Sequence, residues 1–392
     1  MEYVNSLQGF RLAAVHSGLK SDQQKDLVLI VSDNPCQIEA IFTTNQVKAA
    51  PVLYDQNLIA SKTPIQAIVL NAGNANACTG KIGMDHVEIM ANAVCESIGL
   101  ENSKALVMST GVIGVPLSID KVLAGIEDAG NKLTETQWSE AAFAIMTTDT
   151  YPKIISVNNP AGYSIMGIAK GAGMISPDMA TMLSVICTDA KLSDSLMNEV
   201  SEIWDKSFNR IVVDGDMSTN DSVVLMANGA SGVVLGHESD FIQELTSICE
   251  YLAKAIVADG EGATKLVTVS VNGAKCEEDA EKICRAIATS PLCKTAFYGA
   301  DPNWGRFICA AGYSGVEFET NEITLWLTKG NKKIKLFENG MGANYLESEA
   351  QELMLEDEWG VEFDLGEGIG NYWLWTCDLS HEYITINGHY RT

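Results

Sequence analysis

The residues best suited to do chemistry lie in the stretch 170–183. Its glycines and proline predict a tight turn that runs directly into the apolar segment 182–188, which has the pattern of a buried strand. Thr181 stands at the junction. Its hydroxyl can attack the carbonyl of Ala180 and form an ester, and hydrolysis then leaves Thr181 with a free α-amine as base. Such an amine has a reference pKa of about 8, near working pH. On spacing alone, a β-branched residue that opens a strand is the simpler interpretation.

Two further loops offer polar groups. The predicted strand 104–108 ends in the loop Ser109–Pro116, where Gly111 and Gly114 let the backbone turn its N–H groups toward an open site. Such a loop can supply an oxyanion hole, although most Thr-Gly turns are only turns. A predicted helix is followed by three hydroxyls and a carboxylate at 147–150, which can hold a polar ligand or form a solvated C-terminal turn.

The composition restricts the class of protein. The chain has 392 residues, 46% of them hydrophobic, which is enough for a large core in one or two domains. Its formal charge of −25 argues against nucleic acid or an anionic membrane as partner. Ten cysteines without a Cys-x-x-Cys pair and five scattered histidines predict no metal site and a reducing, cytoplasmic location. The N-terminal residues have neither a signal-peptide nor a membrane-span pattern, so we expect a soluble protein.

Strand and helix patterns alternate along the chain and indicate an α/β protein. The predicted strands are 27–31, 38–43, 64–70, 104–108, 153–157, 163–169, 182–188 and 265–271. The predicted helices are 85–98, with Asp85 as N-cap, and 118–129, 134–146, 240–258 and 279–288. Four terminal strands, near 323–327, 361–365, 372–375 and 383–386, are expected to be antiparallel, with 366–370 as a hairpin turn.

Three ligand motifs fail on inspection. The loop 71–81 lacks phosphate-loop spacing, because six residues separate Gly73 from Gly80 and Ile82 stands where Ser or Thr is needed. The acidic stretch 214–221 has Thr219 where a calcium loop needs Gly. The glycines of 366–370 are not followed by a helix, as a dinucleotide fingerprint requires. The sequence therefore predicts no nucleotide or metal loop.

Seven blocks of the sequence resemble the signature blocks of the ornithine acetyltransferases, the self-cleaving glutamate N-acetyltransferases of arginine biosynthesis. The resemblance spans nearly the whole chain in the family's order. The blocks are Asn71–Ala77, Ser109–Gly114, Lys170–Leu183, Asp214–Asp221, Asp301–Arg306, Thr376–Ser380 and Asn387–Thr392.

The resemblance implies a cut between Ala180 and Thr181, which gives an α chain of residues 1–180 and a β chain of residues 181–392 that both contribute to one active site. Thr181 is then the nucleophile, and Thr110 and Gly111 match the oxyanion positions. The positions that match substrate-binding residues are Thr147, Lys170, Thr181, Glu261, Asn387 and Thr392. Thr148 adjoins Thr147, so which of these two hydroxyls faces substrate stays open.

The implied reaction moves the acetyl group from N2-acetylornithine to glutamate by a ping-pong mechanism through acetyl-Thr181. No cofactor is implied, and acetyl-CoA is a possible further acetyl donor. The implied fold is a layered sandwich of β-sheets between helices, with a mainly antiparallel C-terminal portion, and the implied assembly is a heterotetramer of two α and two β chains.

Each implied role is physically reasonable. Attack on an amide makes its oxygen negative, and each oxyanion donor lowers the activation free energy by roughly 3 to 4 kcal/mol. Lys170 suits the backbone carboxylate that both substrates share, and Glu261 suits the ornithine ammonium. Taken singly, both charges are more often surface residues.

Three residues depart from the common family pattern. They are Asp178, where Asn is common, Ser176, where Ala is common, and Met217, where Thr is common. A carboxylate at position 178 can alter the cleavage rate, for instance by raising the pKa of the new amine.

Two other functions fit parts of the sequence. A self-processing hydrolase or aminopeptidase uses the same N-terminal threonine with water as acceptor. An amino-acid-binding protein would never be cut. Acetate release from acetylornithine without glutamate supports the first, and a single uncut chain supports the second.

Overall fold

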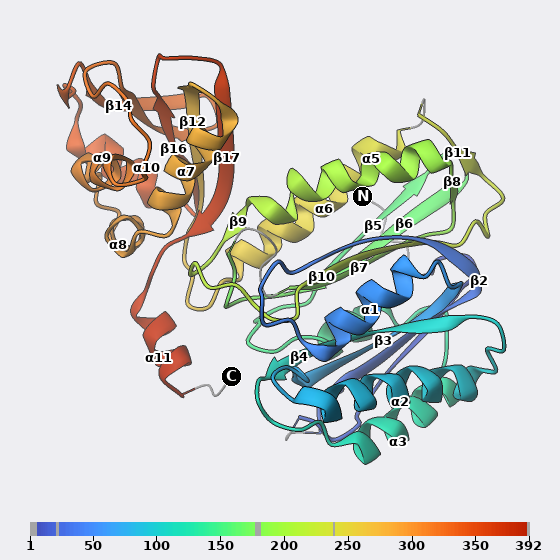
Figure 1. Ribbon diagram of the computed structural model, residues 1–392. Helices are drawn as coiled ribbons and strands as arrows, with labels where there is room; N and C mark the ends of the chain where they lie inside the picture. The colour runs from blue at the N-terminus through green and yellow to red at the C-terminus, as the bar shows by residue number, and fades with distance from the viewer. Residues whose placement is uncertain (1–5, 21–22, 177–181, 238–239, 390–392) are drawn as a thin grey trace. The chain divides into compact units, whose positions relative to one another are not determined.

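The long strand β2 connects two β-layers. The computed structural model describes residues 6–20, 23–176, 182–237 and 240–389. β2 runs over Leu27–Phe42; its first part pairs with β1 and β3, and its last part, residues 37–42, pairs with β10 (Figure 1). The two predicted strands 27–31 and 38–43 are therefore one continuous strand of 16 residues.

The described chain forms two compact units. Unit 1 consists mainly of Met1–Asn209 and Asp216–Ile256, and unit 2 of Arg210–Gly215 and Val257–Tyr390. The predicted cut after residue 180 falls inside unit 1, between neighbouring strands of one sheet, and not at a boundary between units.

Unit 1 has an eight-stranded sheet with the order β4-β3-β2-β10-β7-β6-β5, and β1 beside β2. β7 is parallel to β10 and antiparallel to β6. The remaining strands of this sheet are β1 (Phe10–Val15), β3 (Ile65–Asn74), β4 (Lys104–Val112), β5 (Lys153–Asn159), β6 (Tyr163–Lys170), β7 (Leu183–Thr188) and β10 (Ser222–Ala227). A small parallel pair is formed by β8 (Lys191–Leu192) and β11 (Val234–Leu235).

In unit 1, apolar side chains are buried on both faces of the β-layers. One core cluster joins Ile30 and Leu106 of the first layer to Ile168 and Val185 of the second, so the two β-layers pack against each other. Helices cover the outer faces: α2 and α3 lie side by side on the first layer, and α5 and α6 lie over the second (Figure 1). This is the predicted layered sandwich of sheets between helices.

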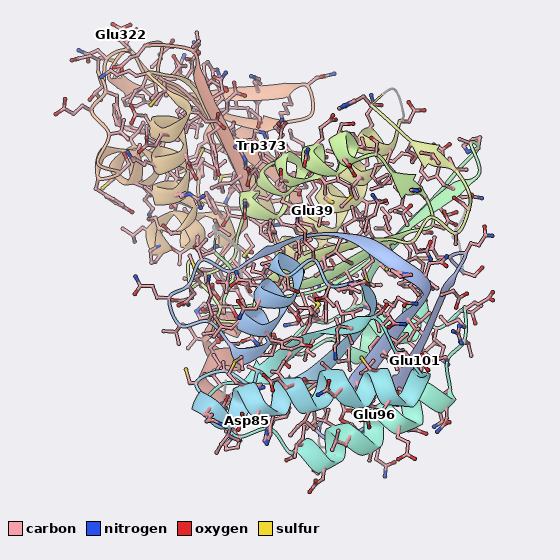
Figure 2. All side chains as sticks on the ribbon, turned by 45° about the vertical axis from the view of Figure 1, so that its right-hand side comes forward. Glu39, Asp85, Glu96, Glu101, Glu322 and Trp373 are labelled. Carbon is pink, nitrogen blue, oxygen red and sulfur yellow. The ribbon has the colours of Figure 1, made fainter. Side chains whose placement is uncertain are left out.

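Unit 1 contains these helices: α1 (Ala50–Ala60), α2 (Gly80–Ile98), α3 (Ile119–Asn131), α4 (Trp138–Ala144), α5 (Asp194–Asp205) and α6 (Phe241–Ala258). A short 3-10 helix, η1, spans Phe208–Arg210. α2 begins at Gly80, five residues before the predicted N-cap, so Asp85 lies inside the helix and forms an exposed ion pair with Lys81. Figure 2 shows Asp85 and Glu96 on the outer side of α2, where acidic residues are solvated.

Unit 2 is built on a seven-stranded sheet with the order β15-β14-β13-β16-β12-β17-β9. The strands are β9 (Ile211–Val212), β12 (Leu266–Ala274), β13 (Thr324–Lys329), β14 (Lys332–Glu338), β15 (Met341–Gly342), β16 (Glu358–Asp364) and β17 (Gly370–Cys377). The helices are α7 (Glu277–Ala288), α8 (Pro291–Tyr298), α9 (Trp304–Gly312), α10 (Glu347–Met354) and α11 (His381–His389).

Two terminal predictions were wrong. The segment 366–370 is not a hairpin turn, because β12 lies between β16 and β17 and pairs with both, parallel to β16 and antiparallel to β17. The segment 383–386 is not a strand but part of α11, which the Ser380 hydroxyl caps by accepting the amide of Glu382 at 3.1 Å.

Candidate active site

The predicted oxyanion residues, Thr110 and Gly111, lie near the end of β4 and beside the parallel strand β3, not in a loop after the strand as predicted, because β4 continues to Val112. Thr110 lies opposite Ala72 and Gly111 opposite Gly73. Gly111 has φ of +129°, and a Cβ there would lie 2.4 Å from the Gly73 carbonyl carbon. Only glycine fits at this position, because any side chain would collide with the backbone of the neighbouring strand.

Two buried asparagines, Asn71 in β3 and Asn220 just before β10, hold this region together. Asn71 Nδ2 donates to the Asn74 carbonyl at 2.8 Å, and its Oδ1 accepts the Ser109 hydroxyl at 2.6 Å. Asn220 Nδ2 donates to the carbonyls of Ala75 and Ser109 at 2.6 and 2.9 Å. These buried amides therefore bind the chain's own backbone and fix the residue that precedes Thr110.

Lys170 is the last residue of β6 and is buried, with 2% of its surface exposed. Its ammonium donates to Thr110 Oγ1 at 3.3 Å. Lys170 and Thr110, which are 60 positions apart in the sequence, are therefore brought together. Because the hydroxyl oxygen accepts from Lys170, its own hydrogen is left to donate to another group.

The strand after the predicted cut lies directly beside Lys170. Leu183 of β7 pairs with Lys170 of β6 on one side and with Ser222 of β10 on the other. The amide of Met182 donates to Asp221 Oδ1 at 2.9 Å. Ala180, Thr181 and Asp178 lie outside the described residues, as does Thr392.

Asp221 is fully buried in the sheet. Burial raises the pKa of its carboxyl well above the usual range, although the Met182 amide and the charge of Lys170 oppose the shift. The hydroxyls of Thr43 and Ser218 also oppose the shift, while Oδ2 makes no hydrogen bond of normal geometry with a described residue. A buried carboxyl is therefore held against the residue that follows Thr181.

Asp149 connects the Thr147 loop to the turn after Lys170. Its Oδ2 accepts the Thr147 amide at 2.9 Å, and its Oδ1 accepts the Gly171 amide and the Lys153 ammonium, each at 2.7 Å. The carboxylate binds the protein's own backbone, so it is not one of the ligand groups that we expected at 147–150.

The charge state of Asp149 follows from these contacts. Burial alone raises the pKa of the carboxyl, but the nearby charges of Lys170 and Lys153, together with the Gly171 hydrogen bond, hold it at about 2. Asp149 is thus a buried anion between two lysines, the opposite of Asp221.

A cavity of about 470 Å³ opens beside the Thr147 loop. Its apolar wall comes from Phe143, Ala144 and Met146, at the end of α4 and just beyond it. Thr147 and Asp149 belong to its polar wall. A cavity of this size holds a small metabolite.

In unit 2 the structure brings Glu261 and Asn387 together. Asn387 Nδ2 donates to Glu261 Oε2 at 2.7 Å. Glu261 is buried and lies before Gly262, whose φ is +71° and where a Cβ would lie 2.6 Å from the Tyr383 amide nitrogen. The Ser380 hydroxyl donates to the Gly262 carbonyl at 2.6 Å, so the Glu261 turn is fixed against the start of α11.

Sequence reasoning gave no role to Lys153 or to the side chain of Asp221, and it treated Asp149 only as a possible ligand group. Only Lys153 gave a local signal, because it opens an apolar strand at a position whose side chain is buried. The two aspartates are identified by the backbone amides that they accept, and these become visible only once the strands are paired. Of the departures from the family pattern, Met217 packs against Thr44, and its carbonyl accepts Asn45 Nδ2 at 3.0 Å.

Across the described ranges, no group of three or more His, Cys, Asp or Glu side chains is arranged to hold a metal ion. No helix in those ranges is both long and apolar enough to span a bilayer. All ten cysteines are free thiols.

Comparison with known proteins agrees with the motifs. A model of the ArgJ family matches residues 11–392. The arginine biosynthesis bifunctional protein ArgJ of Caldanaerobacter subterraneus subsp. tengcongensis is 45% identical over 98% of this chain and 97% of its own. The arginine biosynthesis bifunctional protein ArgJ of Geobacter sulfurreducens is 44% identical over 99% of this chain and 100% of its own. The ornithine acetyltransferase of Mycobacterium tuberculosis, solved with ornithine, is 37% identical over 45% of this chain and 95% of its own, with a TM-score of 0.42. The chain described here belongs to the ArgJ family.

Proposed function

We propose that this chain transfers an acetyl group from N2-acetylornithine to glutamate, after self-cleavage between Ala180 and Thr181. Membership of the ArgJ family supports the reaction, since the relatives named above are arginine biosynthesis proteins. The observation that carries the site is the contact of the Lys170 ammonium with Thr110 Oγ1, beside the strand that begins just after Thr181.

The first half-reaction transfers the acetyl group to the enzyme. The Thr181 hydroxyl oxygen attacks the amide carbon of acetylornithine, and the α-amine of Thr181 takes the hydroxyl proton. Thr110 Oγ–H and the Gly111 N–H donate to the oxyanion. The C–N bond then breaks, the proton passes to the departing nitrogen, and ornithine leaves an acetyl ester on Thr181.

The second half-reaction reverses these steps. The amine of glutamate attacks the ester carbon, and the same two donors stabilise the oxyanion. The C–O bond breaks, and the proton that the attacking nitrogen loses returns to the Thr181 oxygen. Lys170 holds the substrate carboxylate, and Thr147, Glu261, Asn387 and Thr392 complete the binding residues.

Cleavage is tested by denaturing electrophoresis and N-terminal sequencing of the purified protein. We expect two chains, the second beginning with Thr181. Thr181→Ala is expected to stay intact and inactive, whereas Thr181→Ser, which keeps a hydroxyl, is expected to be cleaved. A single chain in the wild type, or a second chain with another first residue, contradicts self-processing at this bond.

The transfer reaction is tested with acetylornithine in the presence and absence of glutamate. We expect ornithine and acetylglutamate in equal amounts when glutamate is present. Free acetate without acetylglutamate identifies the enzyme as a hydrolase instead. Repeating the assay with acetyl-CoA in place of acetylornithine tests the second donor.

Assembly and location are part of the same proposal. Strands from both sides of the cut pair within one sheet, which favours chains that stay together as a heterotetramer of two α and two β chains. Ten free cysteines suit a reducing cytoplasm. Light scattering of the cleaved protein measures the mass of the assembly.

A further inference from the structure

The loop before β2 is built around one buried carboxylate. Asp26 is 1% exposed and accepts four successive backbone amides. The donors are Ser17, Gly18, Leu19 and Lys20, at 2.5, 3.1, 2.7 and 2.9 Å. Because the carboxylate fixes these four residues, the backbone of Lys20 has a defined position and only its side chain is left to adjust.

The Lys20 ammonium reaches the wall of the cavity beside the Thr147 loop. It donates to the carbonyl of Ala144 at 2.9 Å and to that of Lys25 at 3.4 Å. Both of these residues line the cavity. Within the described ranges no carboxylate forms an ion pair with Lys20. The ammonium is therefore held by the backbone oxygens of two residues that line the cavity, although Lys20 itself is not one of the lining residues.

Two carboxylates act on the charge of Lys20, and a third carboxylate, that of Glu140, belongs to a residue that lines the cavity. Burial lowers the pKa of its ammonium, and the charges of Asp26 and Asp149 oppose this, while Lys170 adds to the lowering. Both carboxylates already have close donors: Asp26 has its four amides, and Asp149 has Lys153 and two amides. An incoming carboxylate would thus meet an ammonium whose nearest partners are neutral carbonyls.

The proposed reaction needs such a group. Donor and acceptor share the amino-acid backbone, but the ornithine side chain ends in an ammonium and the glutamate side chain in a carboxylate. A cation beside the cavity attracts the carboxylate of glutamate and repels the ammonium of ornithine. It therefore favours binding of glutamate once the acetyl ester has formed.

We propose that Lys20 binds the side-chain carboxylate of the acceptor, and that the cavity beside Thr147 is the acceptor's side-chain subsite. The inference rests on the proposed function for the identity of the acceptor. It adds a residue of the first loop to the binding residues implied by the sequence motifs, none of which lies before Thr110.

Glutamine, the neutral isostere of glutamate, tests the assignment. In the wild type we expect kcat/KM for glutamate to exceed that for glutamine. In Lys20→Met the value for glutamate is expected to fall at least about tenfold, with little change for glutamine, so that the preference disappears. Lys20→Arg keeps the charge and is expected to keep most of the preference. Lys121→Met is the matched control, because Lys121 donates to the Gly18 carbonyl of the same loop and not to a residue that lines the cavity.

Calorimetric binding of glutamate and glutamine gives a second readout that needs no turnover. We expect Lys20→Met to lose the binding preference and Lys121→Met to retain it. Equal losses for both amino acids, or an unchanged preference in Lys20→Met, overturn the assignment. Absence of ornithine release in the wild type contradicts the proposed reaction instead, and the binding comparison still decides the role of Lys20.

Discussion

Units 1 and 2 each contain a cation paired with a carboxylate, but the two pairs differ in burial. In unit 1 the side chains of Lys153 and Asp149 are both fully buried and 2.7 Å apart. In unit 2 Arg210 is 10% exposed and Glu277 is 64% exposed, at 3.1 Å. The first pair lies beside the predicted oxyanion and substrate residues, and the second lies at the start of β9.

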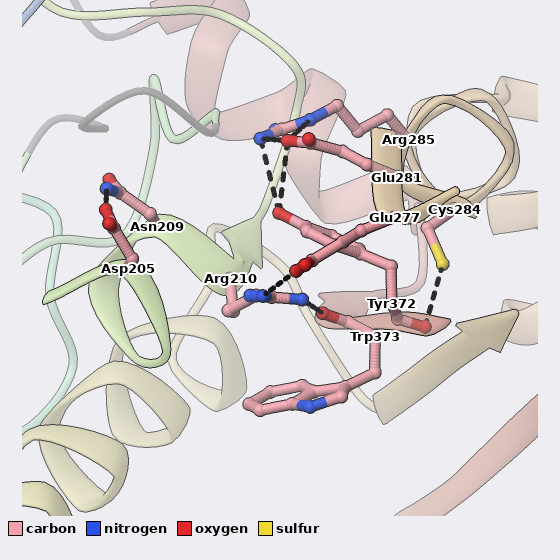
Figure 3. A network of polar contacts seen from close by, with 9 residues as sticks. All are labelled: Asp205, Asn209, Arg210, Glu277, Glu281, Cys284, Arg285, Tyr372 and Trp373. Carbon is pink, nitrogen blue, oxygen red and sulfur yellow. Dashed lines mark hydrogen bonds and ion pairs between the residues drawn. The ribbon is translucent and has the colours of Figure 1, made fainter. Parts of the chain in front are cut away.

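The partners of the two cations also differ. Figure 3 shows Arg210 over the ring of Tyr372, with its guanidinium carbon 3.6 Å from the ring centre, and donating to the Trp373 carbonyl at 3.2 Å. This cation rests on aromatic and backbone groups as much as on its acid. Lys153 also lies over an aromatic ring, that of Tyr151, but at 5.0 Å from the ring centre, and its carboxylate partner is buried beside it. We infer that burial, more than pair geometry, decides which ion pair is essential.

The largest loss of unfolding free energy is expected for Asp149→Asn. The substitution keeps the shape but removes the carboxylate that pairs with the buried Lys153 ammonium, which costs about 3 to 5 kcal/mol of unfolding free energy. Urea unfolding measures this loss. Asp221→Asn is the control. Burial raises the pKa of its carboxyl well above the usual range, and asparagine Oδ1 can still accept the Met182 amide, so we expect a loss below about 1 kcal/mol. Equal losses in the two variants would contradict the comparison.

The next largest effect is expected on the kcat of Gly111→Ala. Gly111→Ala places a methyl group against the Gly73 backbone and displaces an oxyanion donor, so kcat is expected to fall about 100-fold or more. Gly114→Ala also changes a glycine of positive φ, +78°, but its Cβ would meet no atom within 4 Å. Steady-state assays of both variants, with circular dichroism as a check of folding, separate a blocked site from general backbone strain. Equal falls in kcat would argue against a specific role of Gly111.

Acid should weaken unit 1 through Asp149. The pKa of this group is lowered from 3.8 to about 2 in the folded protein. Its contribution, about 2 kcal/mol, is therefore complete above about pH 4 and is lost as the pH falls through about 2. Urea unfolding of the wild type and of Asp149→Asn between pH 5 and pH 2.5 measures the difference. The gap between the two proteins should narrow as the pH falls, and a constant gap would refute the assignment.

The smallest effects are expected in unit 2. Arg210→Lys loses the flat stacking on Tyr372 and is expected to cost about 1 kcal/mol. Glu277→Gln removes an exposed partner and is expected to cost about 0.5 kcal/mol or less. Thermal unfolding of the two variants shows which loses more stability. A larger loss for Glu277→Gln than for Arg210→Lys would show that the exposed ion pair, and not the stacking, holds the arginine.

Elements with strong local patterns were predicted within a few residues. The apolar spacing of α2 places Val87, Met90 and Val94 in the core, as expected. The start of that helix was wrong, because Gly80 and Lys81 have no apolar periodicity although both are helical. α11 was mistaken for a strand because Tyr383 to Ile386 is rich in β-branched and aromatic residues, and the Ser380 cap lies outside that pattern.

The sequence by itself determined the family and the signature blocks, and it predicted the residues that carry chemistry. Those features depend on residue types that are close together in the chain, such as Thr110 next to a glycine that no other residue can replace. Only the tertiary structure decided that Lys170 contacts Thr110, that the pKa of Asp149 is lowered while that of Asp221 is raised, and that β12 separates β16 from β17. Contacts and charge states of this kind arise from strand pairing and burial between distant segments, and local propensity contains no information about either.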